Sequence, residues 1–405
     1  MKHFLTVSFW IIFNLSQAFA ASDIMCVGSV PFTTWLEGVK TEALQRGVSA
    51  AVLQAALPKM IFDQTIIDRD HAQGVFQQSF LKFSDRMVNE GRVNAGRKVY
   101  SNEKYKELMT KIEQEYGVSP FMIMAFWGLE TDFGASVANL KFSILAAVTT
   151  LACDPRRADM FREHLIHALL LIERGDRTVD TMIGNWAGEY GGLQFMSKDY
   201  YLFGVDYDND KKIDIVNSVP DTMATGANFL AKKGWHRGEP WQQEVKIANP
   251  EKMKWQEAGI DITHSVKEWK DMGVIATDGN LANENLQASL LLPMGHKGPA
   301  FLAYPNFKVL LEWNSSITYI TTAGYFGTRL SGAKLIDHSA QNLPLLSQDQ
   351  MIELQKILIA RGHDVGDADG KLGLKTRQAI REEQLKLGLP ADAFPDAELL
   401  QKLKK

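Results

Sequence analysis

The chain has few cysteines, no excess of one charge and only one long apolar run. Two of its 405 residues are cysteine, and 44 basic against 48 acidic residues give a net charge of −4. A nucleic-acid-binding surface needs clustered lysine and arginine, so this balance argues against nucleic acid as a partner. It also argues against simple electrostatic docking on an acidic surface. A single core rarely grows to this size, so we expect two or more domains.

The one long apolar run lies at the N-terminus. It covers residues 4–15 behind a short basic start, and Ala-Phe-Ala follows at 18–20. This order predicts a secretory signal peptide over residues 1–20, cleaved after Ala20, and not a membrane span. Cys26 lies past that site after a methionine, so we expect no lipoprotein signal. The mature protein is expected to be exported, most simply to the periplasm of a Gram-negative cell.

The two cysteines, Cys26 and Cys153, both lie in the exported part. In an oxidising compartment an even pair favours a disulfide. Such a bond would tie the mature N-terminus to the helix that follows residues 128–134. Two unrelated buried thiols are the alternative.

A single acid ends the most apolar internal segment of the chain. Residues 121–127 carry no charge, and Gly-Leu-Glu-Thr-Asp-Phe-Gly follows at 128–134. The Ser-Pro pair before this segment is typical of a helix N-cap and first helical residue. Glu130 would then emerge in the last turn beside Trp127 and Phe133. Apolar surroundings raise the pKa of a carboxyl group and suit it to general acid catalysis. A solvated or ion-paired glutamate is the alternative.

A glycine-rich segment with an amide follows later in the chain. Residues 185–196 read Asn-Trp-Ala-Gly-Glu-Tyr-Gly-Gly-Leu-Gln-Phe-Met. The three glycines allow the backbone to approach a ligand closely, and Gln194 offers both a donor and an acceptor. We expect Trp186, Tyr190 and Phe195 to present flat faces that stack on sugar rings.

Together the two motifs resemble the lytic murein transglycosylases of the membrane-bound lytic transglycosylase B family. The first motif is G-x-E-[ST]-x-[FYW]-G at 128–134, and the second is W-A-G-x-x-G-x-x-Q-F-M at 186–196. The likeness extends from Phe32 to Ser316. Members of that family cleave the β-1,4 bond between N-acetylmuramic acid and N-acetylglucosamine without water and leave a 1,6-anhydromuramoyl end. The resemblance implies a lysozyme-like helical catalytic domain and peptidoglycan glycan strands as the partner. It also implies Glu130 as the catalytic residue and no cofactor for the chemistry.

One acid is enough for that reaction. A glycosidase that uses water needs two carboxyl groups beside the bond, and Asp132 and Glu189 are possible second ones. In a continuing helix Asp132 would point away from Glu130, because residues two apart do not share a face. A transglycosylase lets Glu130 protonate the leaving oxygen and then take the proton of the C6 hydroxyl that attacks C1. The alternatives are a hydrolytic muramidase that uses Glu189 or a nearby aspartate, and a non-catalytic wall-binding protein.

The resemblance also implies a set of substrate-binding residues. Gln194 and Asn314 match residues of the family cleft. Asn185 stands where the family often has serine, and Trp313 stands where tyrosine is usual. Glu189 stands where many relatives have alanine. It could brace the loop, contact the ligand or act as a second carboxylate.

Acidic residues alternate in the segment that follows, with the spacing of a calcium loop. Family members carry an EF-hand-like loop at this place. Lys211 replaces the glycine that normally makes the sharp turn, and an aspartate would close the site in place of a glutamate. We expect a structural Ca²⁺ with weak affinity; an acidic surface turn is the alternative. The candidate ligands are Asp206, Asp208, Asp210, Lys212 and Asp221.

The expected fold class is mainly α, within the α+β class. The catalytic domain is expected over residues 21–332, with a small β-containing insert. Apolar residues at i, i+3 and i+4 predict helices over 35–57, 75–99, 102–116 and 159–174, and a final helix is expected over 317–330. Short strands are expected at 244–248, 288–294 and 307–313.

A polar linker over residues 333–345 precedes a separate module at 346–405. Ser347 and Gln350 are spaced as a capping box. The sequence D-G-x-x-G-x-x-T-x-x-A-I follows, and the segment resembles the small three-helix peptidoglycan-binding domain. Glu383 stands where that family commonly has a buried phenylalanine, so we expect a looser module core. A helical appendage that no longer binds wall is the alternative.

Overall fold

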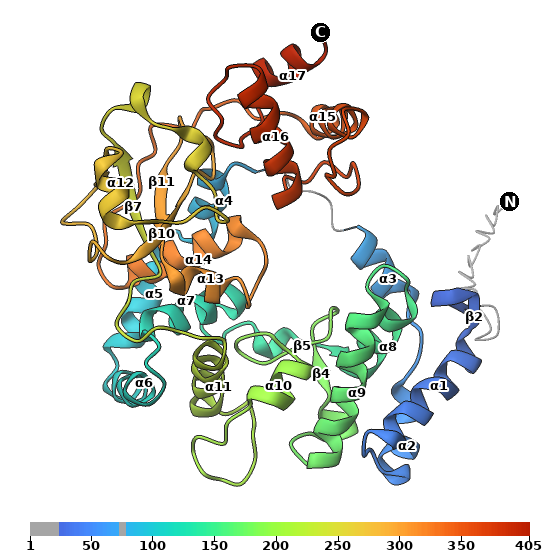
Figure 1. Cartoon of the computed structure of the whole chain (residues 1–405). Helices are drawn as coiled ribbons and strands as arrows, with labels where there is room; N and C mark the ends of the chain where they lie inside the picture. The colour runs from blue at the N-terminus through green and yellow to red at the C-terminus, as the bar shows by residue number, and fades with distance from the viewer. Residues whose placement is uncertain (1–23, 73–77) are drawn as a thin grey trace, which may run out of the picture.

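A computed structural model describes residues 24–72 and 78–405. The predicted signal peptide lies outside the described residues. Figure 1 shows a mainly helical molecule with a small sheet on one side and a separate group of helices at the C-terminal end. In the two described ranges, no helix is both long enough and apolar enough to cross a membrane.

The larger part of the molecule is built from helices around one apolar core. At its centre lies α7 (Pro120–Thr131), which packs against α14 (Ile317–Leu330) and is almost completely buried. Proline at the first helical position of α7 agrees with the predicted start of this helix. The other helices of this part are α1 (Phe32–Gln45), α2 (Ala50–Ala56), α3 (Gln64–His71), α4 (Phe80–Met87), α5 (Glu90–Ser101), α6 (Glu103–Tyr116), α8 (Ile144–Cys153), α9 (Ala158–Arg174), α10 (Ser197–Phe203), α11 (Val219–Lys232) and α13 (Pro305–Leu310).

Two predicted helices are each divided in the structure. The range 35–57 is split between α1 and α2, because Gly47 takes a left-handed φ of 95° and Ser49 caps the second helix. The described part of 75–99 is split between α4 and α5, and Asn89 caps α5. The apolar periodicity continued across both breaks because the flanking helices face the same core. The predictions for 102–116, 159–174 and 317–330 agree with α6, α9 and α14.

The insert is a five-stranded antiparallel sheet in the order β8-β10-β11-β7-β9. It has a core of its own around Trp255 and Trp269, and lies beside α14 and α13 (Figure 1). The predicted strand at 307–313 is wrong, because Pro305 begins α13 there. A short apolar run fits a buried helix as well as a strand. The strands are β7 (Gln242–Ile247), β8 (His264–Ser265), β9 (Val274–Ala276), β10 (Gln287–Leu291) and β11 (Ala300–Ala303), with α12 (Val266–Asp271) between β8 and β9.

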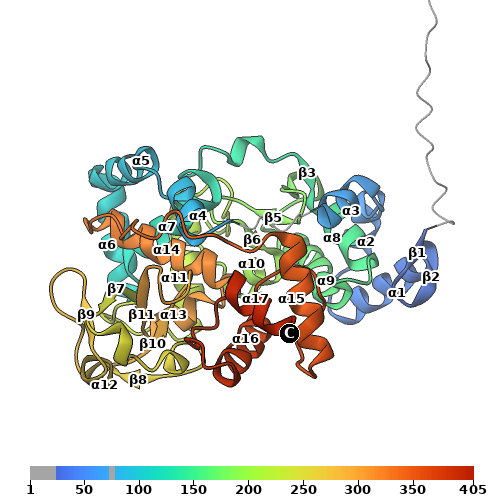
Figure 2. The same cartoon turned by 90° about the horizontal axis from the view of Figure 1, so that it is seen from above.

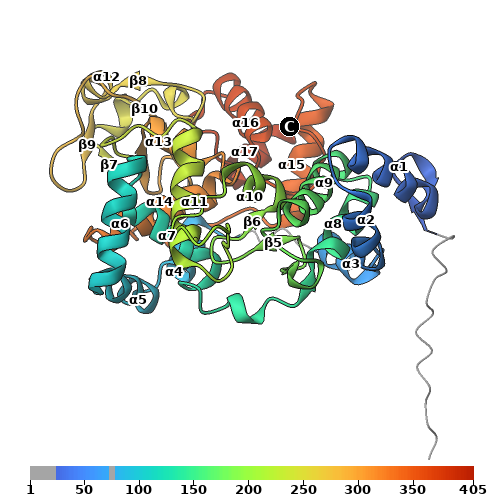
Figure 3. The ribbon, with the colours of Figure 1, turned by 90° about the horizontal axis from the view of Figure 1, so that it is seen from below.

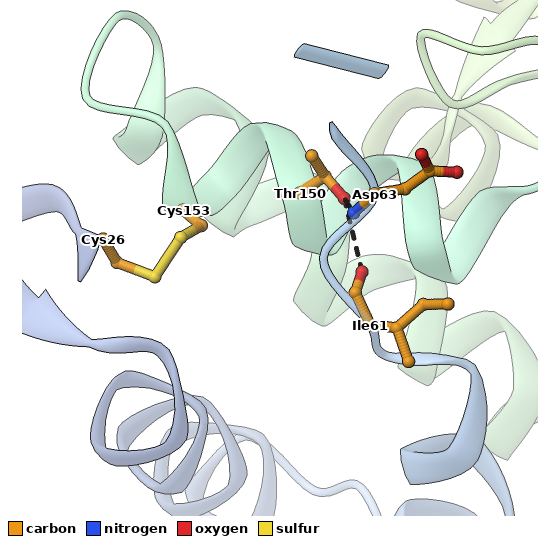
Figure 4. Close-up of a disulfide and its surroundings, with 5 residues drawn as sticks. All are labelled: Cys26, Ile61, Asp63, Thr150 and Cys153. Atoms are coloured by element: carbon orange, nitrogen blue, oxygen red, sulfur yellow. Dashed lines mark hydrogen bonds between the residues drawn. A yellow bond between two sulfur atoms is a disulfide. The ribbon is translucent and has the colours of Figure 1, made fainter. Parts of the chain in front are cut away.

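A disulfide joins the N-terminal segment to the core. Cys26, in β1 (Met25–Cys26), is bonded to Cys153 at the end of α8, which is the predicted pair (Figure 4). One turn earlier, the Thr150 hydroxyl accepts the Asp63 N–H at 2.9 Å and donates to the Ile61 carbonyl at 3.3 Å. The two cysteines are 127 positions apart in the sequence. On the chain-entropy account, closing a loop of that size stabilises the fold by up to about 4–5 kcal/mol.

The C-terminal module consists of α15 (Gln348–Ala360), α16 (Leu374–Lys386) and α17 (Ala397–Leu403). The predicted capping box of Ser347 and Gln350 is present at the start of α15. Glu383 is buried but compensated. Its carboxylate accepts hydrogen bonds from Lys386 at 2.6 Å, His363 at 2.8 Å and Arg361 at 3.1 Å. Two cations and a histidine ring thus satisfy the carboxylate that replaces the expected phenylalanine, so Glu383 is not left unpaired.

Candidate functional site

The end of α7 sets the position of Glu130. The helix stops at Thr131, and Asp132 takes a left-handed conformation with φ of 49°. Asp132 therefore leaves the helix instead of continuing it. Its carboxylate pairs with Arg92 at 2.7 Å on the molecular surface. The inference that Asp132 does not share the face of Glu130 holds, but the cause is the helix end and not the helix periodicity.

Glu130 is half-buried beside α14. Its Oε1 accepts a hydrogen bond from the Tyr319 hydroxyl. Burial, together with the charge of Glu189, raises the pKa of Glu130 to about 7. Hydrogen bonds from Tyr319 and from the Trp313 indole act in the opposite direction. A carboxyl group with this pKa is present in both protonation states near neutral pH, so one residue can give a proton and later accept one.

Tyr319 was missed by the sequence analysis. It lies in α14, close to Glu130 in space but 189 residues later in sequence. Burial and the neighbouring charge of Glu130 raise the pKa of Tyr319 well above its ordinary value. The hydroxyl therefore keeps its proton and remains a donor to Glu130. No motif of the sequence marked this tyrosine, because α14 also carries Tyr325 and follows Glu130 by most of the domain.

A short hairpin brings three of the predicted binding residues together. It consists of β5 (Glu189–Tyr190) and β6 (Phe195–Met196). The Asn185 amide nitrogen donates to the Glu189 carboxylate and, at 2.9 Å, to the Gln194 side-chain oxygen. The Gln194 amide nitrogen donates to the Gly191 carbonyl at 2.7 Å. Each of these polar side chains is thus oriented by a neighbour in the same loop.

Glu189 is a second half-buried carboxyl group in this region. Burial raises its pKa, while the hydrogen bond from Asn185 and the charge of Arg157 lower it. Its charge also acts on Glu130 and Tyr319. The two carboxyl groups therefore share one electrostatic environment. Ionisation of one makes ionisation of the other less favourable.

The hairpin is packed tightly against α7. The Thr131 hydroxyl donates to the Gly192 carbonyl at 2.6 Å. A Cβ on Gly192 would lie 3.1 Å from the Trp127 indole nitrogen, and one on Gly191 would lie 2.0 Å from the Ile215 carbonyl. These two glycines therefore serve the close packing of backbone on protein, whereas the sequence suggested close approach to a ligand.

Two of the three aromatic residues expected to stack on sugar are in the core. Tyr190 is fully buried against Tyr200, with ring centres 5.5 Å apart, and Phe195 is buried against Trp313 at 4.9 Å. The expectation is wrong for both residues. Trp186 is half-buried and keeps part of its ring exposed.

Trp313 and Asn314 follow α13. The Trp313 ring stacks on Phe126 of α7 with centres 4.1 Å apart, and its indole reaches Glu130. Asn314 is exposed, and its side-chain oxygen accepts the Ser316 N–H at 2.9 Å, so it holds the turn into α14. Trp313 thus joins the surroundings of Glu130, while the described contacts of Asn314 belong to the turn.

The acidic loop gathers its carboxylates as its spacing predicted. Oxygens of Asp206, Asp208 and Asp210 all lie within 4.8 Å of one another. Lys211 takes a left-handed φ of 72°, the conformation for which glycine is usually selected. Asp221 is buried and accepts the N–H groups of Tyr207 and Asp214, both at 2.8 Å.

Both parts of the chain match known families. Residues 31–328 match the transglycosylase SLT domain, and residues 347–403 match a peptidoglycan-binding domain. Membrane-bound lytic murein transglycosylase B of Escherichia coli strain K12 is 27% identical over 259 residues, which cover 64% of this chain and 69% of that protein.

Solved structures agree with this match. SltB3 of Pseudomonas aeruginosa, solved with NAG-anhNAM-pentapeptide and with NAG-NAM-pentapeptide, is 33% identical with a TM-score of 0.83, and the match covers 92% of this chain and 99% of that one. Slt35 of E. coli, solved with calcium, has the same fold at 24% identity, with a TM-score of 0.62 and 76% of this chain and 96% of that one covered. This chain therefore belongs to the lytic transglycosylase family of the transglycosylase B type and carries a peptidoglycan-binding domain at its C-terminus.

Proposed function

We propose that this enzyme cleaves the β-1,4 bond between N-acetylmuramic acid and N-acetylglucosamine without water, with Glu130 as the single general acid and base. The observation that carries the proposal is the environment of Glu130. Burial raises its pKa to about 7, and one hydrogen-bonded oxygen fixes its orientation. The other nearby acid on its own segment, Asp132, is committed to Arg92.

The reaction proceeds in two proton transfers through one residue. Protonated Glu130 gives its proton to the glycosidic oxygen as the bond from that oxygen to C1 breaks. The C6 hydroxyl of the same muramoyl unit then attacks C1, and its proton returns to Glu130. The products together contain the atoms of the substrate, and no water is consumed. The attacking hydroxyl is part of the substrate, so its effective concentration is high without a second carboxylate to activate water.

The neighbouring side chains have supporting roles in this proposal. Tyr319 orients Glu130, since its hydroxyl holds one carboxylate oxygen. Gln194 and Asn185 present amide groups to the sugar, and Asn185 also fixes Gln194 at 2.9 Å. Trp313 supplies an aromatic wall beside Glu130. Asn185 and Asn314 are the weaker of the proposed substrate contacts, because the amide oxygen of each already accepts backbone N–H groups.

The rest of the chain places the catalytic domain on its substrate. We assign residues 21–332 to catalysis, 333–345 to the linker and 346–405 to wall binding. The SltB3 complexes with disaccharide pentapeptides support peptidoglycan strands as the ligand. The disulfide between Cys26 and Cys153 suits an oxidising compartment, which supports export to the periplasm after removal of residues 1–20.

We also propose that the acidic loop holds a structural Ca²⁺. Three converging carboxylates, from Asp206, Asp208 and Asp210, are the oxygen donors that this ion prefers. The Lys212 carbonyl would complete the set. Asp221 fits less well as a direct ligand, because it is not one of the carboxylates that lie within 4.8 Å of one another, and it is occupied by the N–H groups of Tyr207 and Asp214. When bound, the ion supplies charge compensation for the loop and takes no part in bond cleavage.

A hydrolytic muramidase is the second candidate, and one observation favours it. Glu189 is a carboxyl group whose charge is felt at Glu130. A base that activates water must be free to accept a proton, whereas Glu189 is held by the Asn185 amide. We therefore prefer Glu189 as a residue that raises the pKa of Glu130.

Replacing the transferable proton should stop cleavage. Glu130→Gln keeps the size of the side chain but cannot act as an acid, so we expect turnover of peptidoglycan to fall by about 10²–10⁴-fold. Thermal unfolding should change little. The matched control is Asp132→Asn, which makes the same change two residues later and should retain turnover. Near-normal activity of Glu130→Gln would contradict the assignment.

The pKa of Glu130 also determines how the rate of cleavage depends on pH. The free enzyme needs Glu130 protonated to begin the reaction, and this pKa is raised to about 7. Below that pH the acid form predominates; above it the acid form is lost. We expect kcat/KM on a soluble glycan to fall about tenfold per pH unit on the alkaline side. A profile that is flat from pH 6 to pH 9 would show that Glu130 is not the acid.

Glu189→Gln separates the two roles of the second carboxyl group. The charge of Glu189 raises the pKa of Glu130, so its removal should move the alkaline limb of kcat/KM to lower pH while cleavage continues. If Glu189 activates water, the same variant loses turnover at every pH. Measuring the full profile, not one pH, distinguishes these outcomes.

Calcium should stabilise the acidic loop. Millimolar Ca²⁺ is expected to raise the Tm of the protein, since an ion bound only by the folded state stabilises it. Chelation should reverse the rise, and Asp206→Asn should abolish it. Asp367→Asn, which removes an exposed carboxylate from the C-terminal module, is the control and should keep the response. An equal response in both variants would mean that the loop is not the site.

A further inference from the structure

A cavity of about 350 Å³ lies where the C-terminal module meets the catalytic domain. Figures 1 and 2 show the module helices next to the insert and above α14. The catalytic domain contributes Phe83, Arg86 and Tyr319 to its walls, and the module contributes Lys371, Arg377 and Phe394. Its lining therefore combines cations with apolar and aromatic surface from two domains.

The two domains are held together beside this cavity. Asp392 of the module accepts hydrogen bonds from the His296 ring at 2.5 Å and from the His296 backbone N–H at 2.8 Å. Arg381 of α16 faces Asp261 of the insert at 3.5 Å. Asp392 is almost fully buried and is also bonded by Gln384 at 2.8 Å. These contacts give the cavity fixed walls, which a binding site requires.

The charge of the cavity is of one sign. Among the described residues that line it there are three cations and no aspartate or glutamate. Lys371 lies 3.6 Å from Asp369, which is outside the cavity. A site lined in this way attracts carboxylates or phosphates.

Arg377 is the least compensated of these cations. In the part of the chain that the structure describes, its guanidinium makes one long hydrogen bond, 3.5 Å to the Ala393 carbonyl, and no ion pair. Arg361, on the neighbouring helix, is by contrast bonded to Glu383 at 3.1 Å. Burial lowers the pKa of Arg377 to about 10, so it stays cationic near neutral pH. The charge of Asp392 also acts on Arg377, but that carboxylate is bonded to His296 and Gln384 and is not in contact with the guanidinium. A half-buried guanidinium with no carboxylate in contact is the kind of group that binds an anionic ligand bidentately.

One residue, Tyr319, belongs both to the wall of this cavity and to the surroundings of Glu130. Its hydroxyl donates to Glu130. The side chain of Tyr319 therefore lies between the cavity and a sugar bound at Glu130. The ligands in the SltB3 complexes carry a pentapeptide on the NAM unit, and a peptide ends in a carboxylate.

We propose that this interdomain cavity binds the peptide stem of the substrate, with Arg377 holding one of its carboxylates. The inference rests on the proposed function, because it takes the muramoyl peptide as the ligand. The module then acts as one wall of the substrate site in addition to its attachment to the cell wall. Specificity for peptide-bearing strands follows from Arg377, Lys371 and Arg86, which the catalytic step itself does not use.

Binding of two soluble ligands to the full mature chain tests this inference. Calorimetry should give a lower Kd for NAG-NAM-pentapeptide than for NAG-NAM, which lacks the peptide. Arg377→Gln should weaken binding of the peptide ligand about tenfold, as expected for one lost charge-assisted contact, and leave binding of NAG-NAM unchanged. Arg377→Lys should retain part of the affinity. Lys356→Gln, which removes an exposed cation from the same module, is the control and should change neither Kd.

Two outcomes would overturn the inference: equal binding of both ligands by the unmodified chain, or an equal effect of Arg377→Gln on both. If Arg377→Gln unfolds, Lys371→Gln probes the same cavity from its surface and should weaken only the peptide ligand. Neither measurement requires cleavage. A chain that prefers the peptide ligand but yields no products would contradict the proposed function and leave this inference standing.

Discussion

The structure depends on keeping one carboxyl group out of water at the end of an apolar helix. α7 is buried on all sides, and its last turn places Glu130 beside α14. Removing a carboxylate from water is costly, so the group takes up a proton more readily than in solution. The Tyr319 hydroxyl limits that cost by bonding one oxygen. The balance of the two effects leaves a pKa of about 7, which is the property that the reaction needs.

Other contacts serve to keep this arrangement fixed. Thr131, the residue after Glu130, bonds the backbone of the hairpin that carries Gln194. Trp313 stacks on Phe126, one turn before Glu130 on α7. On the other side of the domain α6 and α11 lie side by side and pack against α7 (Figure 3). Helix, hairpin and aromatic wall are therefore one packed unit, and a shift in any of them would move the acid relative to its ligands.

Local patterns were sufficient for some elements and not for others. The limits of α14 and the capping box at Ser347 agreed with the sequence, since both depend on residues a few positions apart. The segment at 307–313 was assigned to the wrong class because a short apolar run has no decisive period. The division of residues 35–57 into two helices depended on a turn at Gly47, whose left-handed φ a periodicity argument does not register.

The candidate site was predicted in part for the same reason. Glu130 and the polar residues of the Gln194 loop lie in compact motifs, so the sequence alone was enough to select them as candidates. Tyr319 comes from a helix 189 residues away, so only the folded chain brings it to Glu130. Tyr190 and Phe195 were predicted to stack on sugar rings because a motif shows residue types but not burial. The hydrogen bonds to Glu383 from Arg361, His363 and Lys386 likewise depend on packing that no short pattern reports.

The most direct test of the account is the mass of the glycan ends released from purified peptidoglycan by the mature protein. Glu130 as a single acid and base, with the C6 hydroxyl as the nucleophile, predicts anhydromuramoyl ends that are one water lighter than the products of hydrolysis. Reducing ends from the same digest would contradict that account, because they require water as the nucleophile and a second group to activate it.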